Sequence, residues 1–194
     1  MKISLIQNPA LINIISDPLQ IITLDANFLI PPSRKQLINR DINFEYFSKI
    51  WLDPIFKAFP NLAIHEAVYD ELVEASSKKY ITSKINDKPP TIIIHKDSSL
   101  NETEKMLRDT IEEKIAIHTK YEPALDNKDD RGEVKALSFI AVKGLLYFAA
   151  NDYNAIQLIE KSEVWSTGLD NVQAIKMYEL IFYLHKKTCL TKKP

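Results

Sequence analysis

Short apolar runs that alternate with longer amphipathic segments are the feature that most constrains the fold of this 194-residue chain. Residues 21–24 and 145–150 are apolar stretches of strand length that contain no charged side chain. Such runs suit strands that are buried on both faces of a sheet. Residues 62–64, 91–95 and 164–166 suit three further, shorter strands.

The segments between these runs carry apolar residues at helical spacing. We expect helices over residues 41–57, 66–80, 101–121, 132–143, 153–161 and 170–187. Asp170 is in position to cap the last of them. Strands that alternate with helices indicate a parallel sheet covered by helices. We therefore predict an α/β fold of three layers, α/β/α, with a central parallel sheet of about five strands.

The length suits a single domain with a well-buried core. We expect residues 1–20 to be an N-terminal extension packed on the domain, residues 21–188 to form that domain, and residues 189–194 to be a tail. Cys189 is the only cysteine, which excludes an intramolecular disulfide and a metal site built from thiolates.

The charge of the chain gives no general affinity for nucleic acid, since the net charge is −1 and the sequence pI is about 6.4. Binding of a polyanion must then depend on local basic patches or on a metal. The N-terminus lacks the pattern of a secretory signal, and no stretch reaches the roughly 18 apolar residues of a spanning helix. We expect a cytoplasmic protein without a membrane segment.

Two aspartates follow the clearest strands. Asp25 comes directly after residues 21–24, and Asp152 comes after residues 145–150 and one asparagine. If the two strands are parallel neighbours, both carboxylates emerge at the rim of the sheet where ligands bind in α/β folds. Each aspartate alone also fits an ordinary helix or turn cap.

Two glutamates are predicted on inward helix faces. Helical spacing puts Glu71 on one stripe with Val68 and Leu72, and puts Glu133 on one stripe with Leu137. A buried carboxylate costs several kcal/mol unless it is paired, neutralised or bound to a metal. No lysine or arginine falls on either stripe. Glu133 also fits an acid at a helix N-terminus, which the helix dipole favours by roughly 0.3–1 kcal/mol.

Four carboxylates that gather at one rim repel one another unless a cation compensates them. Oxygen ligands without cysteine or histidine clusters favour Mg²⁺ or Mn²⁺. Such a centre suits hydrolysis of phosphodiester bonds, because the ion polarises the phosphate and activates a bound water. The residue pattern therefore predicts a metal site formed by Asp25, Glu71, Glu133 and Asp152.

The segments around these acids resemble the motifs of the PIN domain, a nuclease fold widespread in bacterial toxins and RNA-processing factors. Residues 24–29 (LDANFL) resemble its opening motif, an apolar strand followed by Asp, a small residue and Asn or Ser. Residues 65–72 (HEAVYDEL) resemble the second, in which the acid directly precedes Leu, and this selects Glu71 over Glu66. Residues 131–137 (RGEVKAL) and 148–155 (FAANDYNA) resemble the third and fourth.

The resemblance covers roughly residues 21–170 and implies a metal-dependent endonuclease, a hydrolase acting on RNA more often than on DNA. It implies that the four acids are both the catalytic residues and the Mg²⁺ or Mn²⁺ ligands. Small toxins of the family often act as dimers that an antitoxin neutralises, so an antitoxin, another protein partner and a homodimer are open alternatives. Glu133 departs from the aspartate frequent at its position, and segment 76–130 is long for a small toxin.

Four polar residues are candidates for supporting contacts around the metal site. Asn27 is placed to orient Asp25, and Asp130 precedes Glu133 closely enough to touch the site. Thr167 and Asp170 follow the predicted strand at 164–166 and would reach the same rim. A turn residue, a solvated loop acid and a helix cap are the respective alternatives for Asn27, Asp130 and Asp170.

A basic segment follows the first motif. Arg34, Lys35 and Arg40 are candidates for contacts to substrate phosphates, although a solvated basic loop has the same composition.

Three other functions compete with an RNA nuclease. They are a phosphotransfer or receiver domain, whose paired acids are missing because Asn27 takes the second position, a PIN-like interaction module without turnover, and a nuclease that acts on DNA.

Overall fold

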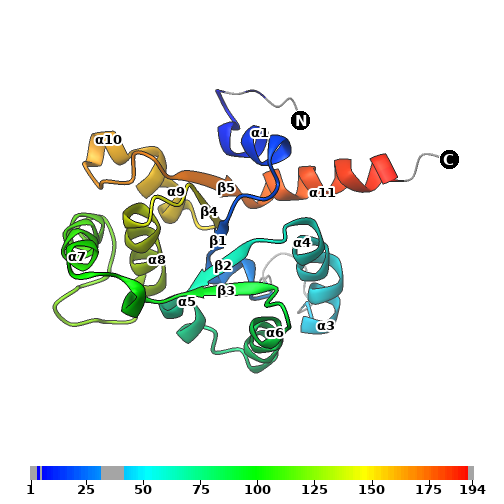
Figure 1. The fold of residues 1–194 in the computed structure, drawn as a ribbon, viewed down its shortest axis with the longest axis horizontal. Coiled ribbons are helices and arrows are strands. Elements are labelled where there is room, and N and C mark those ends of the chain that lie inside the picture. Colours follow the sequence, from blue (N-terminus) through cyan, green and yellow to red (C-terminus); the bar gives the residue numbers. More distant parts are fainter. Residues whose placement is uncertain (1–3, 5, 32–41, 192–194) are drawn as a thin grey trace.

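The computed structural model describes residues 4, 6–31 and 42–191, and it contains a five-stranded sheet (Figure 1). The strands are β1 (Ile22–Leu24), β2 (Leu62–His65), β3 (Ile92–His95), β4 (Tyr147–Ala150) and β5 (Gln173–Lys176). All neighbouring pairs are parallel, and the order is β3-β2-β1-β4-β5. The predicted α/β fold with a parallel sheet of five strands flanked by helices is therefore confirmed.

Helices surround this sheet. In Figure 1, α7, α8 and α10 lie on the left of the drawing and α3 and α4 on the right. The α-helices are α1 (Pro9–Ser16), α3 (Phe44–Phe47), α4 (Asp53–Ala58), α5 (Glu66–Asp70), α6 (Ala75–Asn86), α7 (Glu102–Ala116), α8 (Arg131–Val142), α9 (Tyr153–Glu160), α10 (Ser162–Trp165) and α11 (Met177–Thr191). Shorter turns are the 3₁₀-helices η1 (Ala26–Phe28) and η3 (Asp97–Ser99) and the π-helix η2 (Ser48–Leu52).

The core lies against the central strands. Every residue of β1, β2 and β4 is buried, which explains why their sequences are apolar without alternation. The side chains of Phe28 and Phe148 are completely inaccessible to solvent. Trp51 fastens the helical segment before β2 to this core through a hydrogen bond of 3.0 Å from its indole N–H to the carbonyl of Phe28.

The register of the sheet decides where the two aspartates lie. Leu24 of β1 pairs with Ala149 of β4, and the backbone N–H of Asp25 donates to the carbonyl of Ala149 at 3.0 Å. Because the strands are parallel neighbours, both chains leave the sheet at the same rim. Asp25 and Asp152 therefore follow adjacent strand ends, as their positions in the sequence predicted.

The helix predicted over residues 66–80 is broken in two, so this prediction was wrong. Helix α5 ends at Asp70, and Glu74 caps α6 by accepting a hydrogen bond of 3.1 Å from the N–H of Ser76. Glu71 is the C-terminal cap of α5. Its place near the site therefore follows from the break after α5, and not from an inward stripe along one long helix.

The prediction for residues 164–187 was also wrong. Residues 162–165 form α10, which stops where Ser166 adopts a left-handed backbone with φ of 53°. The last strand is β5, and α11 begins only at Met177, so Asp170 does not cap it. β5 escaped detection because it is an edge strand whose residues, apart from Ile175, are only half-buried, so its sequence is not a continuous apolar run.

The N-terminal segment packs on the same end of the sheet as the last helix. Helix α1 contacts β5 and α11, and the amide of Asn8 donates to the buried carboxylate of Glu179 at 2.5 Å. Within the described part of the chain, every helix is too short or too polar to cross a membrane.

Candidate metal centre

Asp25 is held at the end of β1 with its carboxylate turned into the protein. Only 4% of the residue is exposed. Its Oδ2 accepts hydrogen bonds from the backbone N–H of Asn27 at 3.4 Å and from the Asn27 side-chain amide at 3.1 Å. Burial raises the pKa of Asp25 to about 6, and the charge of Asp152 adds to this rise while the hydrogen bonds oppose it. The carboxylate is therefore oriented but lacks full compensation of its charge.

Asp152 sits at the neighbouring strand end. It is the N-cap of α9, and its Oδ1 accepts a hydrogen bond of 2.7 Å from the N–H of Asn154. Asp25 caps η1 in the same way through Asn27. Both aspartates thus act as caps, which occupies one oxygen of each carboxylate and fixes its direction.

Glu133 is the most unusual of the four acids. It lies in the first turn of α8, is 8% exposed, and its Oε1 has no hydrogen-bond partner among the described residues. Burial, together with the charges of Asp25, Asp152, Asp130 and Glu71, raises the pKa of Glu133 to about 9. Buried polar atoms in folded proteins are almost always paired, so an unpaired carboxylate oxygen calls for a partner.

Glu71 reaches the site through close contact with the start of α8. Its Oε1 accepts a hydrogen bond of 2.5 Å from the backbone N–H of Gly132. A Cβ atom on Gly132 would lie only 2.6 Å from the Glu71 Cδ and 2.7 Å from its Oε1, so the glycine is what lets the Glu71 carboxylate lie this close to α8. Burial raises the pKa of Glu71, and the negative charge of Asp25 acts in the same direction.

The four acids form one electrostatic cluster. Asp152 raises the pKa of Asp25, Asp25 raises that of Glu71, and all three raise that of Glu133. Arg131 lowers the pKa of Glu71, but no ion pair within 4.0 Å joins a described lysine or arginine to any of the four carboxylates. The side chains of the described protein therefore leave this negative charge largely uncompensated.

A divalent cation fits this arrangement chemically. The donors are carboxylate oxygens, which Mg²⁺ and Mn²⁺ prefer, and Glu133 Oε1 is a buried acceptor in need of a positive partner. The four acids do not meet a stricter geometric requirement, because no three of these described residues bring ligand atoms within 4.8 Å of one another. His65, Glu66 and Asp97 bring three such atoms within 4.8 Å of one another.

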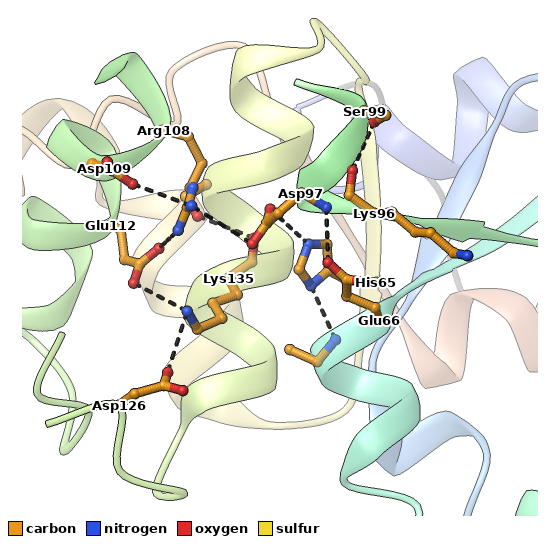
Figure 2. Close-up of polar contacts among 12 residues, drawn as sticks. His65, Glu66, Lys96, Asp97, Ser99, Arg108, Asp109, Glu112, Asp126 and Lys135 are labelled. Atoms are coloured by element: carbon orange, nitrogen blue, oxygen red, sulfur yellow. Dashed lines mark hydrogen bonds and ion pairs between the residues drawn. The ribbon is translucent and has the colours of Figure 1, made fainter. Parts of the chain in front are cut away.

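The group of His65, Glu66 and Asp97 is already satisfied by the protein (Figure 2). The Nδ1 atom of His65 accepts from the backbone N–H of Ala67 at 3.2 Å, so a neutral ring carries its proton on Nε2, which lies 3.2 Å from Asp97 Oδ1. A metal at Nε2 would require the neutral tautomer with its proton on Nδ1. That Nδ1–H would then face the backbone N–H of Ala67, with no acceptor between them. Glu66 accepts from the N–H of Asp97 at 2.8 Å.

A cation also stands beside this second group. Arg108 approaches Asp97 at 3.6 Å and repels any metal ion placed there. We interpret the three residues as a hydrogen-bonded link between the ends of β2 and β3. Among the described residues, no lysine or arginine forms such a pair with Asp25, Glu71, Glu133 or Asp152.

The remaining predicted residues lie in different surroundings. Thr167 and Asp170 precede β5, so they enter the sheet from the rim opposite the one predicted. The Thr167 hydroxyl donates to the carbonyl of Leu158 at 3.3 Å, and Asp170 accepts from Ser162 at 3.0 Å. Both residues therefore brace the connection after α9. Arg34, Lys35 and Arg40 fall outside the described residues.

Asp130 has a local role at the start of α8. Its backbone is left-handed, with φ of 55°, and its carboxylate accepts from the N–H of Lys120 at 2.9 Å. Its charge contributes to the raised pKa of Glu133. Asp130 is therefore near the site, but the hydrogen bond of its carboxylate closes the loop before α8.

The sequence motif predicted Gly132 only as the residue before Glu133. It did not predict that the Glu71 carboxylate packs against this glycine. One signal was available, because the chain contains only three glycines and this one opens a helix. Glycine is a poor helix former, so its presence in a first turn indicates a close approach of another group.

Comparisons with known proteins add no assignment: the chain matches no protein-family model, and a search of curated proteins finds no similar sequence. The fold and the geometry of the four acids therefore carry the functional argument.

Proposed function

We propose that this protein is a metal-dependent endonuclease of the PIN-like type, acting in the cytoplasm on single-stranded RNA. The single observation that carries the proposal is the buried Glu133, whose Oε1 has no partner in the described part of the chain and which lies in a cluster of four carboxylates. A nuclease of this type needs a metal to bring a polyanion to an acidic site, which agrees with the net charge of −1.

The four acids would hold Mg²⁺ or Mn²⁺, with Asp25 and Glu133 supplying the most buried oxygens. When bound, such an ion polarises the phosphate and lowers the pKa of a water molecule. Asn27 keeps the Asp25 carboxylate in one orientation, and the N–H of Gly132 does the same for Glu71. These contacts preorganise the ligands before substrate arrives.

Two other functions use the same geometry: a nuclease that acts on DNA, and a PIN-like interaction module that binds a metal without turnover. An antitoxin or other protein partner and a homodimer are compatible with each of them. One experiment distinguishes these functions, because its possible outcomes are cleavage of RNA, cleavage of DNA, and metal binding without cleavage.

That experiment measures cleavage of labelled single-stranded RNA and DNA with Mg²⁺, Mn²⁺ or EDTA. The proteins are wild type, Asp25→Asn, Asp152→Asn and the control Asp129→Asn, which changes an exposed acid of the loop before α8. Asparagine keeps the capping ability of both site aspartates, so the fold is expected to survive. We expect a loss of at least ~100-fold in both site variants, as removal of a metal ligand predicts, and none in the control.

The outcomes separate the candidate functions. Cleavage that persists in EDTA, or that survives either site substitution, contradicts the proposed mechanism. Preference for DNA replaces the RNA assignment. Binding of Mn²⁺ by wild type, measured by calorimetry, together with no cleavage of either nucleic acid, supports the interaction module instead.

A further inference from the structure

The loop between α7 and α8 is held by a group of charged side chains that meet at Asp126. The Oδ1 atom of Asp126 lies 2.8 Å from the Tyr121 hydroxyl, 2.9 Å from the Arg131 Nε and 3.2 Å from the Lys135 Nζ. Arg131 and Lys135 are four residues apart and lie one turn apart on α8. One oxygen of the Asp126 carboxylate thus contacts side chains from two successive turns at the start of α8.

Tyr121 and Lys135 also connect this group of side chains to Glu112 on α7. The Tyr121 hydroxyl also lies 3.0 Å from Oε1 of Glu112, a residue that is 5% exposed. Figure 2 shows Lys135 beside the same carboxylate, and its Nζ lies 3.6 Å from the same oxygen. Arg108 pairs with the other oxygen of Glu112. Helices α7 and α8 pack directly on each other, so this polar group fixes their relative position at one end.

The backbone of the loop is shaped to bring Asp126 to this point. Asp126 itself is left-handed, with φ of 45°. The Asn127 side chain donates to the carbonyl of Lys120 at 2.9 Å and accepts from the N–H of Glu122 at 2.6 Å. These contacts across the loop close residues 120–127 into a compact turn. The turn leads directly to the start of α8 at Arg131.

The start of α8 carries two features of the acidic site. Gly132 donates its N–H to Glu71, and Glu133 projects into the protein in the same turn. Arg131, which Asp126 holds, immediately precedes them. A shift of this first turn would move the Gly132 N–H away from Glu71 and would redirect Glu133.

We propose that Asp126 and Tyr121 are positioning residues, which fix the first turn of α8 and thereby hold the carboxylates of Glu71 and Glu133 in place for a divalent cation. This inference rests on the proposed function for the identity of the ligand. The contacts that support it, from Asp126 to α8 and from Gly132 to Glu71, are independent of any metal.

The test compares Asp126→Asn and Tyr121→Phe with the control Asp129→Asn. Asparagine tolerates a left-handed backbone, and phenylalanine keeps the buried ring of Tyr121, so each variant removes a polar contact with little change of shape. The first readout is hydrogen exchange and the chemical shift of the Gly132 amide, measured by NMR without metal. The second is the affinity for Mn²⁺.

We expect the Gly132 amide to exchange at least ~10-fold faster in both variants, and Mn²⁺ affinity to fall about 10-fold, as for other groups that orient metal ligands. The control should match wild type in both readouts. Thermal unfolding checks each variant, and Tyr121→Phe decides the question if Asp126→Asn does not fold.

An unchanged Gly132 amide in both variants overturns the inference, as does an equal change in the control. Failure of wild type to bind Mn²⁺ refutes the proposed function instead, and in that case the amide alone decides whether Asp126 and Tyr121 position the Glu71 contact. A changed amide with unchanged Mn²⁺ affinity shows a structural role only and also overturns the inference.

Discussion

Two groups of buried and partly buried acids in this protein differ in how their charge is compensated. Glu112 and Asp97 lie in a network where Arg108 and Lys135 supply the positive charge. Glu133, which is buried to a similar degree, faces three other site carboxylates and has an oxygen without a partner in the described residues. In the first group both carboxylates have cationic partners, although the Nε atom of Arg108 has no hydrogen-bond partner of its own in the described residues. In the second group no described lysine or arginine forms an ion pair with the carboxylates.

The difference shows how a structural network can be told from a ligand site. A buried carboxylate is tolerated when counter-charges and hydrogen bonds surround it. An acid that stays uncompensated lowers stability, and a protein gains from it only through binding or catalysis. Glu112 and Glu133 make the contrast testable, since they are the same residue type at 5% and 8% exposure.

The largest effect on stability is expected for Glu112→Gln. This change removes the buried carboxylate that Arg108 and Lys135, both half-buried, share as a counter-charge. We expect the free energy of unfolding to fall by about 3 kcal/mol, which is typical for removal of one partner of a buried ion pair. Urea denaturation measures it, with Glu113→Gln, an exposed neighbour on α7, as the control. A loss no greater than in the control would show that the network does not stabilise the fold.

The opposite sign is expected for the same substitution at Glu133. At pH 7 Glu133 is ionised in the unfolded chain but must take up a proton on folding, because its pKa rises to about 9. Glutamine avoids this cost, so in EDTA at pH 7 the free energy of unfolding should rise by about 2 kcal/mol. With saturating Mn²⁺ the order should reverse, because only the wild type gains a ligand for the ion. A decrease in stability in EDTA would mean that Glu133 is already compensated.

The pH dependence of this difference follows from the raised pKa of Glu133, about 9 against an ordinary 4.5. The folded protein retains the proton up to about pH 9, while the unfolded chain releases it near pH 4.5. The stability from the bound proton is complete below pH 4.5 and is lost as the pH rises to 9. The advantage of Glu133→Gln over wild type in EDTA should therefore grow from pH 5 to pH 9, and a constant difference would contradict the raised pKa.

The smallest effect on stability, but a large one on binding, is expected for Gly132→Ala. The new Cβ meets the end of the flexible Glu71 side chain, which can turn away, and alanine favours the helix by ~1 kcal/mol. The melting temperature should therefore change little, while Mn²⁺ affinity falls about 10-fold because one ligand is displaced. Unchanged affinity, measured by calorimetry, would remove Glu71 from the site. Gly144→Ala does not serve as a control, because Gly144 has a left-handed backbone.

The sequence was informative where a residue and its strand are close neighbours in the chain. Asp25 and Asp152 were assigned to one rim of the sheet because strands buried on both faces appear in the sequence as continuous apolar runs. The same reasoning failed at β5, whose half-buried residues carry no such signal, and it therefore misplaced Thr167 and Asp170. Glu71 was selected by a motif, although the long helix expected around it is absent.

By itself, the sequence determined the class of the fold and the identity of the acids, because burial on both faces of a strand dictates composition locally. Only the tertiary structure decided which acids are compensated. Arg108 meets Glu112 on one helix, but Lys135, Tyr121 and the uncompensated Glu133 acquire their surroundings from segments distant in the chain. Electrostatic energy depends on distances in space, and those distances exist only after the sheet and helices have packed.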